Sequence, residues 1–177
     1  MRILLLGKNG QLGYEAHRSL IYSGEVIALD YPDVDFSKPE DVIKVVDEQK
    51  PELIYNAVAY TDVDRAESDY KKVMKVNCDT PGEIAAFCKS KNIKLIHIST
   101  DYIFDGKKNA LYFENDVPNP INIYGKSKLE GEKAIIDSGC DFLIFRTSWV
   151  YSLRTGGFVN KVIDWAKEYE ELKIVSD

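Results

Sequence analysis

The sequence MRILLLGKNGQLG, residues 1–13, decides the fold. Ile3–Leu6 is a short, continuous apolar run, which is typical of a strand buried on both faces of a parallel sheet. Gly7–Gly13 follows with a glycine at every third position, and Tyr14–Ile21 has helical character. The opening of the chain therefore predicts a strand, a glycine-rich loop and a helix in direct succession.

The alternation of apolar runs with amphipathic segments continues along the chain. Further strands are predicted at residues 26–29, 53–55, 95–98, 142–145 and 172–175. Helices are predicted at 39–48, through 85–87, at 124–136 and at 158–167; Ser37 is the expected N-cap of the first, with Pro39 in its first turn. An unpatterned segment spans about 105–122, and a loop of that length is more often functional than idle. The pattern predicts an α/β fold with a doubly wound parallel sheet.

Composition narrows the class of partner. The 177 residues suit one domain, and a formal net charge of −6 with pI near 5.1 argues against nucleic-acid and anionic-membrane surfaces. Cys78, Cys88 and Cys140 are odd in number and widely spaced, so neither a disulfide framework nor a zinc or other metal site is expected. The apolar opening is too short for a signal peptide, and no stretch reaches the ~20 apolar residues of a membrane span. A cytoplasmic protein that acts on small molecules is predicted.

The glycine-rich loop is a candidate phosphate cradle. A pyrophosphate there would meet free backbone N–H groups and the positive end of the helix dipole, although a tight turn alone also explains the spacing. Asp30 follows the second predicted strand, where a carboxylate can bind a ribose hydroxyl and repel a 2′-phosphate. This favours NADH over NADPH; the alternative is a turn aspartate before Pro32. Asp35 and Phe36 are candidates to flank an adenine, and Phe36 reads equally as core.

The segment Asn56–Thr61 follows the third predicted strand, at the edge where open α/β sheets bind ligands. Its small alanines would let a cofactor lie against the backbone. The carboxylates of Asp62, Asp64 and Glu67 suit helix capping and solvated charge better than a metal site.

Tyr124 and Lys128 form a Tyr-x-x-x-Lys pair, downstream of Ser99-Thr100-Asp101-Tyr102. Residues i and i+4 share a helix face, and a cation beside a phenol lowers its pKa toward the catalytic range. A solvated helix face is the alternative for the pair alone. By similar reasoning, His97 inside an apolar strand is expected to be a packed histidine.

Five segments together resemble the extended short-chain dehydrogenase/reductase family, in its dTDP-4-dehydrorhamnose reductase branch. They run in family order across nearly the whole chain, at residues 7–13, 56–68, 99–106, 124–132 and 146–151. The resemblance implies a Rossmann-type fold that binds NAD(P)H, and Asp30 favours NADH of the two. It also implies reduction of the 4-keto group of dTDP-4-dehydro-L-rhamnose to dTDP-L-rhamnose, an activated sugar for surface polysaccharide.

Site residues carry over by position. Tyr124 would donate the proton, Lys128 would hold the nicotinamide ribose and lower the tyrosine's pKa, and Thr100 would bind the sugar C4 oxygen. Asp101, Tyr102 and Trp149 would contact the substrate; alone, Trp149 would read as a core aromatic. The residues implied to line the cofactor, besides Tyr124 and Lys128, are Gly7, Gly10, Gln11, Leu12, Gly13, Asp30, Asp35, Phe36, Ala59, Tyr60 and Thr61.

Two departures from the family bear on function. Gly157 stands where members often carry asparagine. The family chain also continues past position 177, so a dinucleotide-binding domain is expected over 1–177, with the C-terminal substrate domain largely absent and turnover impaired. The expected partners are a nucleotide sugar and a second copy in a homodimer. Two other functions stay open: another sugar-nucleotide epimerase or dehydratase, and a non-catalytic NAD(P)-binding regulatory subunit.

Overall fold

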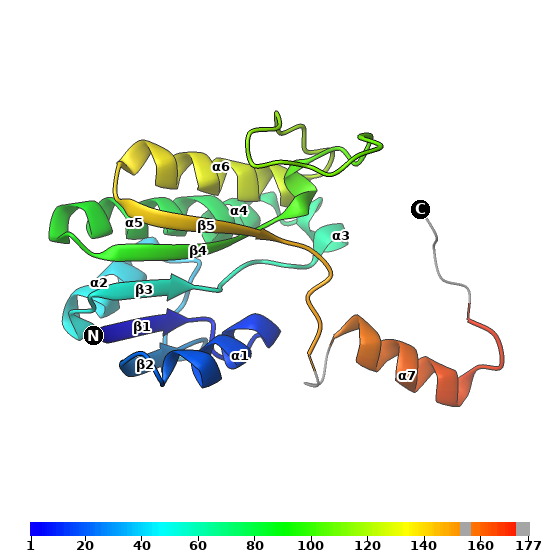
Figure 1. Cartoon of the computed structure of the whole chain (residues 1–177), viewed down its shortest axis with the longest axis horizontal. Coiled ribbons are helices and arrows are strands. Elements are labelled where there is room, and N and C mark those ends of the chain that lie inside the picture. Colours follow the sequence, from blue (N-terminus) through cyan, green and yellow to red (C-terminus); the bar gives the residue numbers. More distant parts are fainter. Residues whose placement is uncertain (153–156, 173–177) are drawn as a thin grey trace.

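The computed structural model describes residues 1–152 and 157–172. Five parallel strands form one sheet in the order β2-β1-β3-β4-β5 (Figure 1). The strands are β1 (Arg2–Leu6), β2 (Glu25–Leu29), β3 (Leu53–Asn56), β4 (Lys94–Thr100) and β5 (Asp141–Thr147). All five agree with the predicted runs, whereas residues 173–175 of the sixth predicted strand lie outside the described residues. The doubly wound α/β fold is confirmed.

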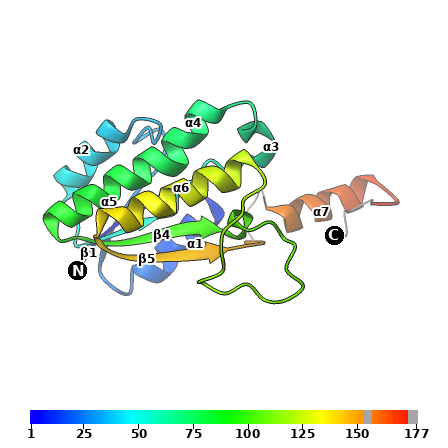
Figure 2. The same cartoon turned by 90° about the horizontal axis from the view of Figure 1, so that it is seen from above.

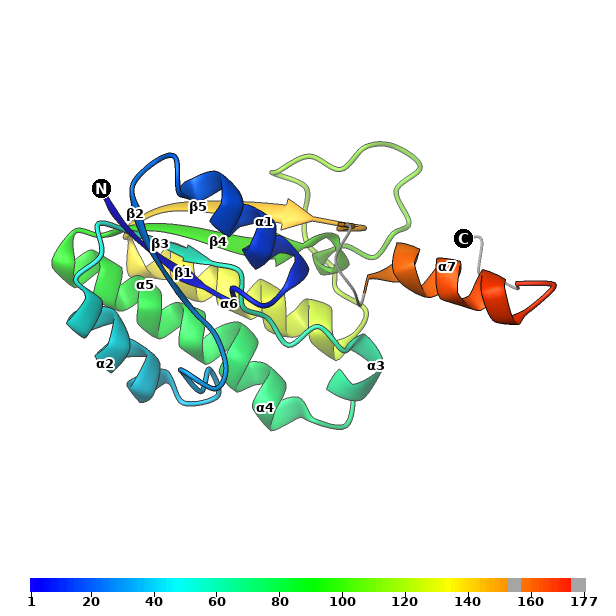
Figure 3. The ribbon, with the colours of Figure 1, turned by 90° about the horizontal axis from the view of Figure 1, so that it is seen from below.

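Helices cover both faces of the sheet. Figures 2 and 3 show α2 (Pro39–Gln49), α5 (Thr80–Lys91) and α6 (Ile123–Ser138) on one face and α1 (Gln11–Leu20) on the other. The last described helix, α7 (Phe158–Glu168), lies beyond the carboxyl ends of the strands. Among the described residues, no helix is long and apolar enough to cross a membrane.

The strand order creates the edge at which a ligand can bind. From β1 the chain moves outward to β2, then crosses back over β1 to reach β3. Connections therefore leave β1 and β3 in opposite directions, and such a switch point opens a crevice at the carboxyl ends of the strands. The loops after β1, β3, β4 and β5 all lie at that edge.

The core explains why β1 reads as an unbroken apolar run. Ile3, Leu4, Leu5 and Leu6 are all fully buried, because helices lie on both sides of the strand. Leu4 and Leu6 pack in the main cluster, which α2, α5 and α6 complete with the side chains of Val42, Val46, Ile84, Ala85, Cys88 and Ile135. Cys78, Cys88 and Cys140 are free thiols.

Two predicted helix starts were wrong. The first helix begins at Gln11 rather than Tyr14, with Gly10 as N-cap, so the glycine loop is shorter than the glycine spacing indicates. The second helix has Lys38 at its N-cap, followed by Pro39, and not Ser37. The Ser37 hydroxyl instead donates to Asp35 Oδ1 at 2.7 Å, which draws it away from the helix end.

The segment between β3 and β4 is more broken than predicted. It contains α3 (Val63–Ala66), α4 (Tyr70–Met74) and a π-helical turn over Lys75–Asp79 that leads into α5. Asp62 caps α3 by accepting from Arg65 N at 3.0 Å, which confirms the capping prediction. The π turn is the wider coil that often marks functional sites.

Glycine is required at two positions near the end of β1, one in the loop and one in the first turn of α1. Gly7 has φ +92°, a left-handed conformation that side chains rarely adopt. A Cβ on Gly13 would lie 1.9 Å from the Gly7 carbonyl oxygen, so α1 can pack this tightly only because Gly13 has no side chain.

We expect Gly13→Ala to lower the free energy of unfolding by about 1–3 kcal/mol, because backbone must move to relieve the clash. Gly10→Ala is the matched control. A Cβ there would meet only Gly7 O, at 3.5 Å, so the loss should stay below about 1 kcal/mol. Urea unfolding followed by circular dichroism measures both. Equal losses in the two variants would contradict the packing argument.

Candidate active site

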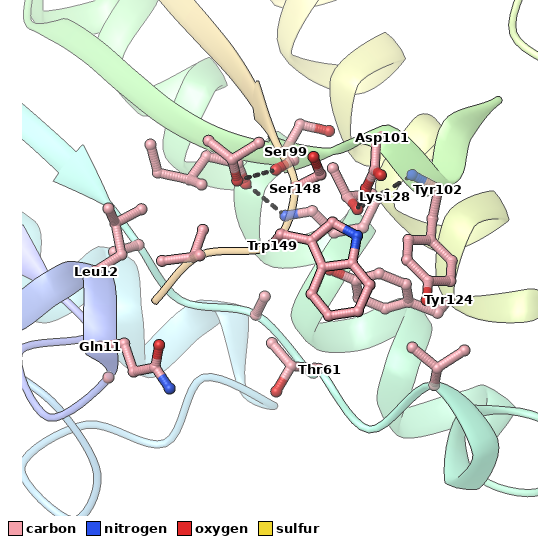
Figure 4. Close-up of a pocket in the computed structure, with 18 of the residues that line it drawn as sticks. Gln11, Leu12, Thr61, Ser99, Asp101, Tyr102, Tyr124, Lys128, Ser148 and Trp149 are labelled. Atoms are coloured by element: carbon pink, nitrogen blue, oxygen red, sulfur yellow. Dashed lines mark hydrogen bonds between the residues drawn. The ribbon is translucent and has the colours of Figure 1, made fainter. Parts of the chain in front are cut away.

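A pocket of about 640 Å³ lies at the carboxyl edge of the sheet. Its walls come from the loops after β1, β3, β4 and β5 and from the first turns of α1 and α6. Figure 4 shows Gln11 and Leu12 of α1 on one side, facing Tyr124, Lys128 and Trp149 across the space. Residues more than 100 positions apart in the sequence therefore meet here.

The glycine loop presents the start of α1 to the pocket. The first N–H groups of a helix have no partner within it, and here they lie beside Gly10 in the pocket wall. Asp30 holds this loop in place, because its carboxylate accepts from Asn9 N at 2.8 Å and from Tyr31 N at 2.7 Å. Lys8 pairs with Asp33 nearby, at 2.7 Å.

A buried asparagine fixes the wall formed after β3. Asn77, in the π turn, is fully buried. Its Oδ1 accepts from Tyr60 N at 2.8 Å, and its Nδ2 donates to Tyr60 O at 3.1 Å and to Ser127 Oγ at 3.0 Å. Asn77 thus ties the Ala59–Thr61 segment to α6. Sequence reasoning missed it; the available signal was one amide in an otherwise helical apolar pattern.

The start of α6 positions the tyrosine and the lysine. Asn122 caps the helix by accepting from Gly125 N at 2.7 Å, so Tyr124 and Lys128 lie on its inward face. Both are buried, at 9% and 1% exposure. The ring of Tyr102 packs edge to face on Tyr124, with centroids 5.6 Å apart. The pair is therefore not a solvated helix face.

The pKa of Tyr124 differs from expectation. Burial raises the pKa of this phenol, an interaction with the Thr100 hydroxyl lowers it in part, and the Asp101 charge raises it. The predicted lowering of this pKa by Lys128 was wrong for this structure. The Lys128 ammonium donates to the carbonyl of Ile98, 2.7 Å away.

Lys128 is a buried residue in the lining of the pocket. Its Nζ lies 3.3 Å from His97 Nε2 as well as bonding to Ile98 O. Burial lowers the pKa of Lys128 to about 8, and the Glu132 carboxylate acts in the opposite direction. His97 is fully buried, as a packed histidine should be. Burial, reinforced by Lys128, holds the pKa of His97 well below its usual range.

Trp149 stands at the rim of the pocket. It is 76% exposed, has a left-handed φ of +49°, and packs edge to face on Phe158 at 5.3 Å. Gln11 joins the two sides of this rim: its amide donates to Val150 O and accepts from Gly157 N, each at 3.0 Å. A Cβ on Gly157 would lie 2.4 Å from the end of the Gln11 side chain, so a larger residue there would displace the Gln11 amide from these two contacts.

The predicted site residues divide into two groups. Eleven line the pocket: Gly10, Gln11, Leu12, Ala59, Thr61, Thr100, Asp101, Tyr102, Tyr124, Lys128 and Trp149. Six others are not among the lining residues: Gly7, Gly13, Asp30, Asp35, Phe36 and Tyr60. Among these, Phe36 packs in the core at 7% exposure and the Tyr60 phenol donates to Asp69 at 3.3 Å. Residues that line the pocket without having been predicted include Asn9, Ile98, Ser99 and Ser148.

The described residues hold no cluster of three or more His, Cys, Asp and Glu suited to a metal ion. Around the pocket, the arrangement instead offers an anion-binding helix start, a buried phenol and a buried amine. A parallel sheet with these groups at its carboxyl edge defines the class, a Rossmann-type dinucleotide-binding fold.

The family follows from comparison with known proteins. The model of the family described as "RmlD substrate binding domain" matches residues 1–177. The chain belongs to this family.

Individual relatives agree with that assignment. The dTDP-4-dehydrorhamnose reductase of Burkholderia thailandensis is 45% identical over the whole of this chain and 59% of its own length. The enzyme of the same name from Escherichia coli K12 is 41% identical, again over the whole chain and 60% of its own length. The chain thus spans about 60% of the length of these curated relatives.

Solved structures give the same result. A dTDP-4-dehydrorhamnose reductase from Clostridium acetobutylicum superposes with a TM-score of 0.93 at 39% identity, over 99% of this chain and 62% of that one. One from Bacillus anthracis, in complex with NADP, has a TM-score of 0.91 at 35% identity, over 97% and 61%. A UDP-glucose 4-epimerase from Thermus thermophilus is 22% identical, and that likeness shows the fold alone.

Burial of Lys128 predicts a specific dependence of stability on pH. Its folded pKa of about 8 lies below the ordinary value of 10.5, so the unfolded state binds the proton more tightly. The resulting penalty is fully present below about pH 8 and disappears as the pH rises past 10.5. A shift of this size corresponds to roughly 3 kcal/mol.

We therefore expect the unfolding free energy of the unchanged protein, minus that of Lys128→Met, to rise by about 3 kcal/mol between pH 7 and pH 10.5. Urea titrations at several pH values measure this difference, in which other titrating groups cancel. Lys126→Met, an exposed lysine on the same helix, is the control and should show no such rise. If the difference for Lys128→Met does not change with pH, the pKa of Lys128 is not lowered by burial.

Proposed function

We propose that this chain binds NAD(P)H and takes part in reducing the 4-keto group of dTDP-4-dehydro-L-rhamnose to dTDP-L-rhamnose, an activated sugar for surface polysaccharide. One observation carries the proposal. Thr100, Tyr124 and Lys128 converge in the same pocket that receives the N-terminus of α1. The names of relatives that are 37–45% identical over the chain support the choice of substrate.

The residues present fit a dinucleotide. The start of α1, bare of side chains at Gly10, suits a pyrophosphate, and the small Ala57 and Ala59 leave room along the wall after β3. We propose Gly7, Gly10, Gln11, Leu12, Gly13, Asp30, Asp35, Phe36, Ala59, Tyr60 and Thr61 as the residues that form or support this site. When bound, NAD(P)H supplies the hydride for reduction.

Side chains of this protein would supply the proton that the reduced ketone oxygen needs. Tyr124 is buried and protonated at neutral pH, because burial raises the pKa of its phenol. It can therefore donate a proton to the oxygen that gains charge as the ketone is reduced. Thr100, beside it, would bind the same oxygen and orient it. Asp101, Tyr102 and Trp149 are proposed to contact the sugar from the rim.

Further parts of the proposal concern the whole protein. We propose residues 1–177 as the dinucleotide-binding part, with the nucleotide end of the substrate gripped by the additional length that the relatives have. A cytoplasmic location and a homodimer stay predictions. The exposed Leu143 and Phe145 on the edge strand β5 offer an apolar surface for self-association, which light scattering would detect.

We expect Tyr124→Phe to bind NADH with nearly unchanged affinity and to lose about 10²–10⁴-fold in kcat, because it removes only the transferable proton. Lys128→Ala should weaken both, since the amine also holds the cofactor. Tyr22→Phe, an exposed tyrosine far from the pocket, is the control. NADH oxidation is followed with the dTDP-4-keto sugar, using residues 1–177 and, in parallel, a chain of the relatives' length.

The outcomes separate the possible functions. Equal losses in both parameters for Tyr124→Phe and Lys128→Ala would mean that the roles are misassigned. Robust turnover by residues 1–177 alone would show that the additional length is dispensable. NADH binding without turnover at either length would favour a regulatory NAD(P)-binding subunit.

The carboxylate of Asp30 generates a prediction on cofactor choice. Its negative charge beside the loop should oppose a 2′-phosphate, so NADH should bind more tightly than NADPH. Asp30→Ser should narrow the gap by improving NADPH. Asp47→Asn removes an exposed carboxylate elsewhere and serves as control. Fluorescence titration measures the affinities of all three proteins for both cofactors, and tighter NADPH binding by the unchanged protein would refute this role for Asp30.

A further inference from the structure

A chain of buried polar groups runs beneath the pocket from β3 to α6. Asn56 and His97 are partners in the register of β3 and β4, and both are buried. Asn56 Nδ2 lies 3.1 Å from His97 Nδ1, and His97 Nε2 lies 3.3 Å from Lys128 Nζ. The imidazole therefore connects an amide to the amine proposed to act in catalysis.

The backbone fixes the orientation of the amide. Val58 N donates to Asn56 Oδ1 at 3.1 Å, so the other amide atom, the NH₂ group, faces His97. Turning the amide over would set that NH₂ group against the N–H of Val58. Asn56 is thus a donor toward the ring.

This orientation fixes the tautomer of the ring. A donor from Asn56 requires a lone pair on His97 Nδ1, and a neutral imidazole with a bare Nδ1 carries its hydrogen on Nε2. The opposite tautomer would place two N–H donors 3.1 Å apart. His97 therefore presents an N–H group to Lys128.

The lysine responds to that N–H. An uncharged amine can donate to Ile98 O and accept from His97 Nε2–H with its lone pair, so both contacts are satisfied. An ammonium has no lone pair, and it would turn a hydrogen toward another hydrogen. We propose that Asn56 and His97 act as a positioning pair that favours the uncharged form of Lys128.

Other charged and titratable groups around Lys128 also affect its protonation. Glu132, on the same helix, favours the ammonium, but it is paired with Arg146 of β5 at 2.7 Å. Asp101 and Tyr124 line the pocket above. Burial of Lys128 works in the same direction as the His97 N–H, and lowers its pKa to about 8.

The effect of this pair on cofactor binding and turnover rests on the proposed function. An ammonium has three N–H groups, so beside Ile98 O it can donate to two hydroxyl groups of a bound cofactor. The amine has two N–H groups, and its lone pair is occupied by His97, so beside Ile98 O it can donate to one hydroxyl group. The Asn56–His97 pair would therefore set the pH at which Lys128 changes between these two modes. Turnover should follow that pH.

The first test needs neither cofactor nor substrate. ¹⁵N NMR of the histidine-labelled chain reports which ring nitrogen carries hydrogen, and His17→Gln assigns the signals because the chain has only two histidines. We expect His97 to carry hydrogen on Nε2 alone. Hydrogen on Nδ1, or on both nitrogens near neutral pH, would overturn the proposal without any variant that must fold.

Asn56→Asp tests the link to the lysine. A carboxylate can accept from both Val58 N and His97 Nδ1–H, so the hydrogen should move to Nδ1 and leave a lone pair facing Lys128. The Lys128 titration midpoint, followed by ¹³C NMR and assigned with Lys128→Arg, should then rise by about one pH unit or more. A raised midpoint with the hydrogen still on Nε2 would assign the effect to charge alone and overturn the pair's role.

The pH profile of kcat separates this inference from the proposed function. In an active protein, the limb that reflects Lys128 should move with the NMR midpoint in Asn56→Asp. A merely structural histidine would lower kcat at every pH without moving the limb, which would overturn the positioning role. Absence of turnover in all proteins, with the NMR results as expected, would contradict the proposed reaction and leave the tautomer assignment intact.

Discussion

The burial of β1 on both faces is the constraint on which the rest of the structure depends. A strand with four consecutive side chains fully buried needs helices on both sides, and α1 can lie close enough only because Gly13 carries no Cβ. The same contact places the first turn of α1 at the carboxyl edge of the sheet. Core packing thus brings the unpartnered N–H groups at the start of α1 to the site.

The fold was largely predictable because its signals are local. The five described strands are apolar runs, as expected for strands covered by helices on both faces of the sheet. Each strand ends within about two residues of its predicted limits. The start of α1 was misplaced, since Gly10 caps the helix with its backbone alone and carries no side-chain signal. The break before α5 was missed because it depends on Asn77, whose three hydrogen bonds reach Tyr60 and Ser127, 17 and 50 residues away.

The candidate site was predictable in its members and not in its charge states. Helix spacing predicted that Tyr124 and Lys128 share one site, and the family resemblance added Thr100. The structure brings all three to one pocket. Spacing on one helix face did not indicate that the Lys128 amine would turn to Ile98 O, on a different element. The direction in which a long side chain points is decided by its tertiary partners. The pKa values of Tyr124 and Lys128 therefore depend on β4, which supplies the carbonyl that Lys128 contacts.

Buried polar groups at this edge are costly, and their connection explains how the fold tolerates them. A lone amine as deeply buried as Lys128 would be strongly destabilising, but Ile98 O and His97 satisfy it. Asn56 in turn satisfies the His97 ring, and Val58 N satisfies the Asn56 amide oxygen. Each group in this chain has one arrangement compatible with its neighbours. A network of that kind removes alternative side-chain positions from the floor of the pocket. Burying the Lys128 amine costs free energy, but the same contacts give it a defined position and favour one protonation state in the pocket, where the proposed reaction requires both.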